Sequence, residues 1–576
     1  MIKPLQSLGI LLYFFFLALP AAAQPLLDSE SRFHPIIGAK GMVVSQEMVA
    51  SQVGASILAE GGNAIDAAVA TGFALAVTLP QAGNLGGGGF MLIYLADENR
   101  TVAIDYREMA PSAATKDMFL NAQGEVDAGK ARFSVQSSGV PGTVAGLVHV
   151  QEKYGNLSLK KVMAPAIKLA RSGIRVTVGL SESLSSHRRL LQSNVGAKQY
   201  FFKKDGADYA AGDVLKQRDL AASLKRISAQ GAEGFYQGKT AELFLAQMER
   251  TGGLITQADL DNYAVVERSP ICGDYRDHRV CAMPPPSSGG IHLVQMLNIL
   301  EGWDLKGLGH NSADYIHRLV ESMRRAYADR SQYLGDADFF SVPVESLINK
   351  DYARVLRDTI DLDHASRSAD IGPGLKGTPE STETTHFSVW DDWGNVVSNT
   401  YTLNFSYGSG IAVVGSGFLL NNEMDDFSAR PGSPNGFGLV GGVANSIESG
   451  KRPLSSMTPT IVFDPQGKPL LVTGSPGGST IITVVLQMVL NVLEFDMGIA
   501  EASAASRIHH QWLPDDVYYE TGISPDTLRR LREMGHLVSD GAAVLGSTQS
   551  IQSNGEGVLF GATDSRAHGA GVAIQP

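Results

Sequence analysis

The hydrophobic pattern near the start of the chain predicts two packed helices. Apolar residues recur every four positions from Val49 to Ile57, which places them on one face of a helix, and Ser45 is its expected cap. The stretch 65–79 is apolar nearly all round, which indicates a helix that is buried on every side. Pro80 ends this second helix, because proline does not continue the hydrogen-bond ladder.

Strand-like runs follow at 90–95 and 101–104, after four consecutive glycines at 86–89. The glycines lack the Lys-Ser/Thr pair of a phosphate-binding loop, so we expect a tight backbone passage near a buried site. Between about residues 142 and 360 the pattern is mostly helical and has no catalytic signature of its own.

The pattern changes at residues 366–383, where glycine, proline, serine and threonine replace most large apolar side chains. This composition is typical of a flexible linker. Two strand-like runs, 386–390 and 396–403, follow the linker and flank the turn 391–395, which predicts a β-hairpin. Thr384 lies at the boundary between the linker and the first strand.

The composition and the net charge of the chain indicate which classes of partner and substrate are favoured. At 576 residues the chain has room for several units of roughly 100 to 200 residues each. The formal net charge is -12 and no Lys/Arg cluster forms a basic face, which disfavours nucleic acid as a partner. Small polar substrates are more consistent with this net negative charge.

The first residues predict an export signal, residues 1–23. Lys3 supplies a positive start, 10–19 form an apolar run, and 21–23 are three alanines that match a cleavage site, so the mature chain begins near Gln24. No later stretch reaches about 18 uninterrupted apolar residues. We therefore expect a periplasmic or secreted protein without a membrane anchor.

The two cysteines, Cys272 and Cys281, are close enough in sequence to lie on neighbouring strands of a hairpin. In an oxidising compartment they either pair or remain buried thiols, and spacing alone does not decide between the two. Two cysteines do not form a structural zinc site, and no His-Glu-x-x-His run occurs. We expect no metal and no other cofactor.

Thr384 is where an N-terminal nucleophile enzyme would carry its catalytic residue. A strand would fix the side chain, while the linker before it could be cut away. The α-amino group released by such a cut has a pKa of about 7.7 to 8 and would activate the hydroxyl as a base. Position alone is weak support, because a threonine at the start of a strand is ordinarily only a β-branched residue in a sheet.

Residues 384–389, Thr-Thr-His-Phe-Ser-Val, resemble the processing-site motif of the γ-glutamyltransferase family. Further segments that resemble family signatures follow the family's order along the chain, at residues 105–111, 400–404, 421–428, 452–457 and 473–478. By this resemblance the chain is identified as a member of the family. The resemblance implies an α/β (α+β) fold, the four-layer αββα sandwich of the N-terminal nucleophile hydrolases.

The resemblance also implies that the chain cuts itself between Glu383 and Thr384. A large chain of residues 24–383 and a small catalytic chain of residues 384–576 would then form a heterodimer. Thr384 would be the nucleophile, and Thr402 would hydrogen-bond it and assist both processing and catalysis.

The remaining site residues carry over in the same way. Arg107, Ser455 and Ser456 would hold the α-carboxylate of a glutamyl group, which suits the planar fork of a guanidinium. Asn404, Glu423 and Asp426 would hold its α-ammonium, although some relatives have glutamine in place of Glu423.

Gly477 and Gly478 would donate backbone N–H groups to an oxyanion, in front of an apolar helix-like run at 481–493. Residues 431–442 resemble the lid loop of many members, with Phe437 in place of a tyrosine found in some. His386, His509 and His510 have no part in this mechanism, and we expect them to be structural.

The implied activity is that of a γ-glutamyltransferase and glutathione hydrolase, with water or an amino acid or peptide as acceptor. Its nearest rivals are an acylase specific for glutaryl groups and an enzyme that cuts poly-γ-glutamate. A binding protein that kept the fold and lost activity is a rival of another class, but Thr384, Thr402 and Arg107 are all present. A Ser-His-Asp hydrolase is disfavoured because no Gly-x-Ser-x-Gly motif occurs.

Overall fold

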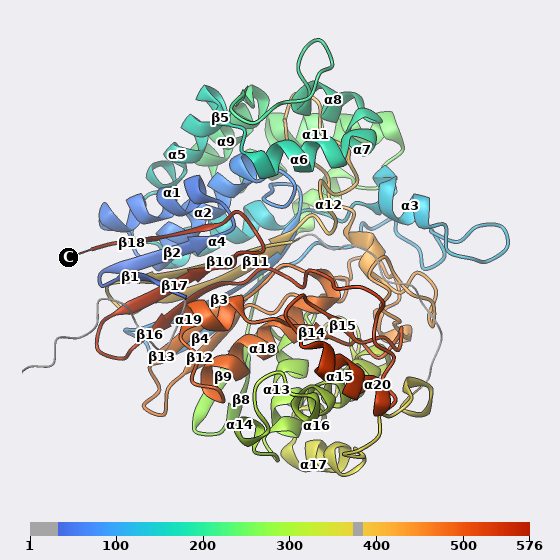
Figure 1. Cartoon of the computed structure of the whole chain (residues 1–576). Coiled ribbons are helices and arrows are strands. Elements are labelled where there is room, and N and C mark those ends of the chain that lie inside the picture. Colours follow the sequence, from blue (N-terminus) through green and yellow to red (C-terminus); the bar gives the residue numbers. More distant parts are fainter. Residues whose placement is uncertain (1–32, 373–383, 576) are drawn as a thin grey trace, which may run out of the picture.

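The computed structural model describes residues 33–372 and 384–575, which form two stacked β-sheets between two layers of helices (Figure 1). Each of the two large sheets has seven strands, and every strand pair in them is antiparallel. This arrangement confirms the predicted four-layer αββα sandwich. The predicted signal, residues 1–23, lies outside the described residues, and so do Glu383 and most of the predicted linker.

The first sheet mixes strands from both sides of Thr384. Its order is β18 (Ala570–Ala573), β2 (Gly41–Ser45), β10 (Thr385–Asp391), β11 (Val396–Thr402), β3 (Gly88–Leu95), β4 (Arg100–Tyr106) and β7 (Val266–Arg268). The hairpin of β10 and β11 lies where the sequence predicted it, and it is inserted between β2 and β3.

The second sheet also combines early and late parts of the chain. Its order is β1 (Ile36–Gly38), β17 (Leu559–Thr563), β16 (Gln549–Ser553), β13 (Pro469–Thr473), β12 (Thr460–Phe463), β9 (His278–Ala282) and β8 (Ile271–Tyr275). Two short strand pairs lie outside the large sheets: β5 (Ile174–Arg175) with β6 (Val214–Leu215), and β14 (Ile508–His509) with β15 (Tyr518–Tyr519).

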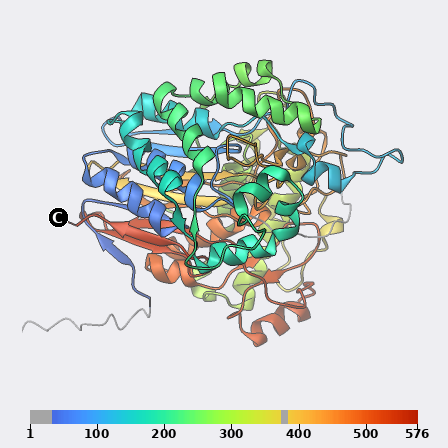
Figure 2. The ribbon, with the colours of Figure 1, turned by 90° about the horizontal axis from the view of Figure 1, so that it is seen from above.

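Helices from the first half of the chain cover the outer face of the first sheet, and Figure 2 shows them from above. They begin with α1 (Met48–Ala59), α2 (Ala64–Thr78), α4 (Thr143–Tyr154), α5 (Leu159–Ser172) and α9 (Arg218–Gln230). Further helices of this half are α3 (Ala128–Phe133), α6 (Val178–Ser186), α7 (Arg188–Gln192), α8 (Val195–Phe201), α10 (Glu233–Tyr236), α11 (Gly238–Thr251) and α12 (Gln257–Asn262).

The second sheet is covered by later helices, among which α13 and α18 are labelled below the sheets in Figure 1. They are α13 (Gly289–Leu300), α14 (Leu305–Leu308), α15 (Ala313–Tyr333), α16 (Val344–Leu347), α17 (Lys350–Asp358), α18 (Ile481–Leu493), α19 (Ile499–Ala504) and α20 (Pro525–Glu533). None of the described helices is both long enough and apolar enough to cross a membrane.

The side chains of the strands alternate between two cores, as the two-residue period of a strand requires. In β3, Met91 and Ile93 face the core beneath the first helical layer, while Phe90 and Leu92 face the core between the sheets. Both faces of the strand are therefore apolar. For this reason the strands predicted in this part of the chain have continuously hydrophobic sequences rather than alternating ones.

One predicted boundary was wrong. Ser45 does not cap α1, because it pairs with Phe387 and Ala570 as the last residue of β2. The helix begins three residues later, and the side chain of Glu47 accepts a hydrogen bond from the backbone N–H of Ala50 as its cap. Helix α2 is buried along its whole length, as the pattern predicted.

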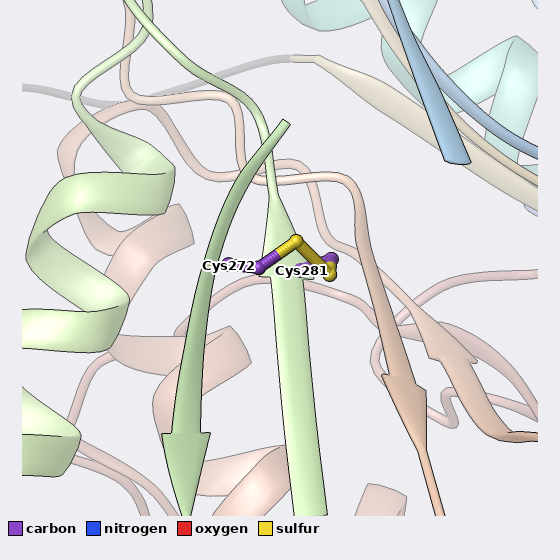
Figure 3. Close-up of a disulfide and its surroundings, with 2 residues drawn as sticks. All are labelled: Cys272 and Cys281. Atoms are coloured by element: carbon purple, nitrogen blue, oxygen red, sulfur yellow. A yellow bond between two sulfur atoms is a disulfide. The ribbon is translucent and has the colours of Figure 1, made fainter. Parts of the chain in front are cut away.

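Cys272 and Cys281 form a disulfide between the paired strands β8 and β9 (Figure 3). The two residues face each other directly in the register of the hairpin. The structure thus selects the paired alternative of the two that the sequence left open. A covalent link here ties the edge strand of the second sheet to its neighbour.

We expect the double variant Cys272→Ser/Cys281→Ser to unfold more easily than the parent protein. The disulfide closes a short loop of the unfolded chain, whose lost entropy corresponds to about 2 to 3 kcal/mol of stability. Denaturant unfolding of the variant and of the parent, each with and without reductant, measures the effect. A variant that unfolds at the same denaturant concentration as the oxidised parent would contradict this prediction.

Candidate functional site

Thr384 lies in a small pocket, of about 20 Å³, at the start of β10. The antiparallel pairing of β10 and β11 brings it beside Thr402, the last residue of β11, and the two Oγ1 atoms are 3.4 Å apart. Both threonines are buried. The same pocket contains side chains that the sequence predicted for the site, namely Arg107, Asn404, Glu423, Asp426, Phe437, Ser455 and Ser456.

A network of buried charges forms one wall of the pocket. Arg107 follows the end of β4, and its Nη1 and Nη2 donate to the carboxylates of Glu423 and Asp426, which lie on a single turn of 3-10 helix, Glu423–Asp426. A third carboxylate, Glu108, lies 3.7 Å from Nη1. The residues predicted for the carboxylate and for the ammonium of the substrate are therefore connected to each other within one network.

Burial shifts the pKa values of the charged side chains in this network. Desolvation raises the pKa of Glu423 and of Asp426, although the guanidinium of Arg107 opposes the shift. Desolvation also raises the pKa of Glu108 to about 7, again against the charge of Arg107. Burial alone would lower the pKa of Arg107, but the three carboxylates raise it, so Arg107 remains charged.

Asn404 takes a backbone conformation that few residues adopt. Its φ is 79°, in the left-handed region that asparagine tolerates better than most side chains. Its N–H donates to Thr402 Oγ1 at 2.8 Å, and its Nδ2 donates to the carbonyl of Asn422 at 2.9 Å. The strained turn links Thr402 to the segment that carries Glu423.

Gly477 and Gly478 form the turn that leads into α18. Both have positive φ values, 136° and 52°, and a Cβ at Gly477 would lie 2.4 Å from Thr480 Oγ1, so the turn requires glycine. Among the described residues, neither backbone N–H donates a hydrogen bond to another group. Gly478 lines the pocket of Thr384, whereas Gly477 lines a neighbouring cavity.

That neighbouring cavity is larger, at about 520 Å³. Phe437, from the predicted lid loop, lines both spaces and therefore lies between them. Its ring stacks on Phe405 with the centroids 4.8 Å apart, and its carbonyl accepts a hydrogen bond from Gln511 Nε2 at 3.1 Å. The lid loop is thus packed against the protein.

The structure adds two residues that we did not predict for the site. Arg330, on α15, lines the pocket, and its Nη2 donates to Ser456 Oγ at 3.2 Å. Its helix has an ordinary amphipathic pattern, so no signal in the sequence distinguished it. Glu108 lay within a segment that resembled the family, but a side chain next to Arg107 in sequence gave no indication that it joins the buried network.

The three histidines that we expected to be structural are buried and hydrogen-bonded. Desolvation lowers the pKa of His386 to about 3, and its Nδ1 lies 2.8 Å from Thr400 Oγ1. Burial likewise lowers the pKa of His509 and of His510 to about 4. All three are therefore neutral at pH 7, and none of them lines the pocket of Thr384.

A cluster of His317, Glu321 and His536 lies elsewhere, with possible ligand atoms within 4.8 Å of one another. Glu321 is already paired with Arg324 at 3.2 Å and Arg325 at 2.6 Å. The two guanidinium groups neutralise the carboxylate on which a metal ion would depend, so we assign this cluster a structural role.

Comparison with known proteins places this geometry in a family. A family model described as Gamma-glutamyltranspeptidase matches residues 50–574. The glutathione hydrolase proenzyme of Escherichia coli (strain K12) is 53% identical over 538 residues, which are 93% of this chain and 92% of that protein.

Two solved structures are similar as well. The crystal structure of a cephalosporin acylase from Bacillus halodurans has a TM-score of 0.83 at 27% identity, and the match covers 97% of this chain and 99% of that chain. That of the Helicobacter pylori gamma-glutamyltranspeptidase has a TM-score of 0.56 at 50% identity, and it covers 57% of this chain and 93% of that chain.

We expect Glu108→Gln to stabilise the protein more at pH 8 than at pH 5. The folded-state pKa of about 7 lies above the ordinary value of 4.5, so the unfolded chain loses this proton first as the pH rises. The carboxyl group therefore costs folding free energy that grows between these two pKa values and reaches about 3 kcal/mol above them. Thermal unfolding at both pH values measures this, and an equal gain at pH 5 and pH 8 would contradict it.

Proposed function

The chain belongs to the gamma-glutamyltranspeptidase family, and from this premise we propose that Thr384 is the nucleophile of the reaction and the first residue of a processed catalytic chain. The activity is that of a γ-glutamyltransferase and glutathione hydrolase. The observation that carries our assignment is that Thr384 shares one buried pocket with Thr402 and with Arg107, Glu423 and Asp426.

In the first step of our proposal, the chain cuts itself. Thr384 Oγ1 attacks the carbonyl carbon of Glu383, the bond to the nitrogen of Thr384 breaks, and water hydrolyses the resulting ester. Thr402, whose Oγ1 lies 3.4 Å from that of Thr384, would orient the hydroxyl during the attack. The products would be a large chain that ends at Glu383 and a small chain that begins at Thr384.

In catalysis, the freed α-amino group of Thr384 takes the hydroxyl proton as Oγ1 bonds to the γ-carbonyl carbon of the donor. The same proton passes to the departing nitrogen as the carbon–nitrogen bond breaks. The N–H groups of Gly477 and Gly478 would stabilise the oxyanion, because neither is engaged by another described residue. Water or an acceptor amine then releases the glutamyl group from the ester.

Donor recognition would depend on the charged wall of the pocket. Glu423, Asp426 and Asn404 would receive the α-ammonium, and Arg107, Ser455 and Ser456 would hold the α-carboxylate. Burial raises the pKa of both acids, and an ammonium beside them would favour their ionised forms. A zwitterionic γ-glutamyl group therefore complements this wall.

The departing amine would occupy the larger cavity, which adjoins the pocket at Phe437 and the Gly477–Gly478 turn. Its lining residue Arg566 is already paired with Glu520 and with Asp564, the latter at 3.0 Å. The cavity therefore presents little net charge. Such a space suits a dipeptide leaving group and a neutral or zwitterionic acceptor.

Location and assembly complete the proposal. The apolar start of the chain, residues 1–23, would direct export to the periplasm or the medium. The processed chains would remain together as a heterodimer, because each large sheet contains paired strands from both sides of Thr384. No nucleic acid and no cofactor takes part in this mechanism.

A second candidate is a glutaryl acylase, since a cephalosporin acylase shares the fold. A glutaryl group has no nitrogen, so two buried carboxylates would face no cation of the substrate. Placing them beside an uncharged methylene group would cost free energy without a compensating interaction. The presence of Glu423 and Asp426 in the pocket therefore favours a γ-glutamyl donor.

We expect purified protein to consist of two polypeptides, and Thr384→Ala to remain one chain without activity. Denaturing electrophoresis measures the cleavage, and a chromogenic γ-glutamyl anilide, with and without a dipeptide acceptor, measures the reaction. Thr384→Ser is the matched control, because it keeps a hydroxyl. Cleavage of the alanine variant at this bond would mean that another protease makes the cut.

We expect Asp426→Asn to reduce kcat/KM for the γ-glutamyl anilide by roughly ten- to a hundredfold, since a charge-assisted hydrogen bond to the ammonium is worth about 1.5 to 3 kcal/mol. Turnover of the glutaryl anilide should hold steady or rise, because its carboxylate no longer meets that of Asp426. The ratio of the two rates cancels differences in folding or maturation. An equal loss with both donors would show that Asp426 does not contact the ammonium.

A further inference from the structure

The pocket of Thr384 is too small to admit a donor while its walls stay in place. Its volume of about 20 Å³ has room for about one water molecule, and a γ-glutamyl group is several times larger. The lid loop, residues 431–442, supplies Phe437 and Leu439 to the wall and contains no helix and no strand of a sheet. It is therefore the wall that moves with the least disturbance of the fold.

The tip of the lid loop is a compact turn held by its own hydrogen bonds. The side chain of Asn435 accepts from the backbone N–H groups of Phe437 and Leu439 at 2.9 and 3.1 Å, and the N–H of Asn435 donates to the carbonyl of Leu439 at 3.0 Å. These bonds remain when the tip moves as a unit. Contacts with the rest of the protein therefore decide where it lies, and the hydrogen bond from Gln511 to the carbonyl of Phe437 is one of them.

An aromatic stack joins the tip to the protein. The ring of Phe405 stacks on that of Phe437 with the two planes 16° apart, and the guanidinium carbon of Arg132 lies 5.9 Å from the centre of the Phe405 ring. Phenylalanine lacks the hydroxyl of a tyrosine, so the side chain of Phe437 holds the lid through stacking and not through a hydrogen bond. Phe405 directly follows Asn404, whose N–H donates to Thr402, so the stack attaches the lid beside Thr402.

Asp425 fixes the tip next to this stack. Its Oδ2 accepts from the N–H of Gly436 at 2.8 Å, and its Oδ1 accepts from Nε of Arg132 at 3.3 Å. A Cβ at Gly436 would lie 2.6 Å from Cζ of Phe405, and closer still to Asp425 Oδ2. Gly436 is not among the glycines with positive φ, so this position requires glycine for space and not for conformation. The tip, the stack and the carboxylate are therefore in direct contact.

We propose that Phe405 is a positioning residue that latches the lid loop over Thr384, and that a donor enters when its stack with Phe437 opens. The inference rests on the proposed function, which places the donor beside Thr384. Arg132 and Asp425 support the latch from the side of the protein. All of these contacts are between protein groups, so a weaker latch raises the open fraction both before and after the donor binds. Association and dissociation of the donor then accelerate together.

Chymotrypsin measures the opening without any substrate, because Phe437 and Leu439 are only 6% and 7% exposed while the lid is in place. Phe405→Leu keeps an apolar side chain and removes the stack, so we expect cleavage after these residues to be roughly tenfold faster. Phe437→Tyr keeps both rings and should be cleaved no faster than the parent. Phe560→Leu is a matched control, because it removes a partly buried ring of β17 that lines neither cavity.

Gly436→Ala tests the same contact from the side of the lid. Its methyl group displaces Asp425 or Phe405, so cleavage of this variant should also be roughly tenfold faster. The double variant Phe405→Leu/Gly436→Ala should be cleaved little faster than either single variant, since both changes open one contact. Two effects that multiply in the double variant would contradict a single latch.

Binding kinetics then connect the latch with donor entry. The probe is a γ-glutamyl analogue with a methylene group in place of the scissile N–H, and surface plasmon resonance measures its two rate constants. In Phe405→Leu both constants should rise roughly tenfold, which leaves Kd within about threefold of the parent value. Faster dissociation alone would mean that Phe405 shapes the bound site, and unchanged rates would also contradict the latch.

The proposed function fails in a different way. A parent protein that neither binds the analogue nor turns over the γ-glutamyl anilide would contradict the proposed function, whatever the variants do. The cleavage experiment needs no substrate, so it would still test the latch in that case. An active parent whose lid is cleaved at the same rate as that of Phe405→Leu would contradict the latch alone.

Discussion

The ion pairs of Arg107 with Glu423 and Asp426 are the constraint on which the pocket depends. They join residues 316 and 319 positions apart in sequence, and they do so at almost complete burial. Removing one partner of such a pair typically costs 3 to 5 kcal/mol, because the other charge is left without compensation. The end of β4 and the turn Glu423–Asp426 are therefore fixed relative to each other, and Thr384 lies beside both.

The sequence predicted those helices and strands in which the hydrophobic period of the residues matches their burial in the structure. Helix α18 begins and ends at the predicted residues. In the hairpin, β10 extends one residue beyond its prediction at both ends, and β11 ends one residue earlier than predicted. Ser45 was misplaced because a short polar residue before a helix looks like a cap even when a strand continues through it. A local sequence pattern does not indicate which distant strands pair with β2, and in the structure these strands are β10 and β18.

The site was predictable only where a motif marked it. Thr384, Arg107 and Asp426 came from ordered segments that resemble a family, and the fold brings them into one pocket. Arg330 comes from a helix that carries no such motif, and only the assembled fold brings its side chain into the pocket. Electrostatic environment of this kind is a property of the assembled structure, since each charge faces groups from other elements.

Because each large sheet contains strands from both sides of Thr384, a cut before Thr384 changes how the protein can unfold and refold. Strand β10 lies between β2 and β11, and β2 in turn lies between β10 and β18, so neither product could leave without opening a sheet. Before the cut, unfolding and refolding are unimolecular, and the native state can be regained from a single chain. After it, complete unfolding releases two molecules, and regaining the native state becomes a second-order reaction that slows on dilution. The mature enzyme would then persist through its barrier to unfolding, as a kinetically trapped product of its own precursor.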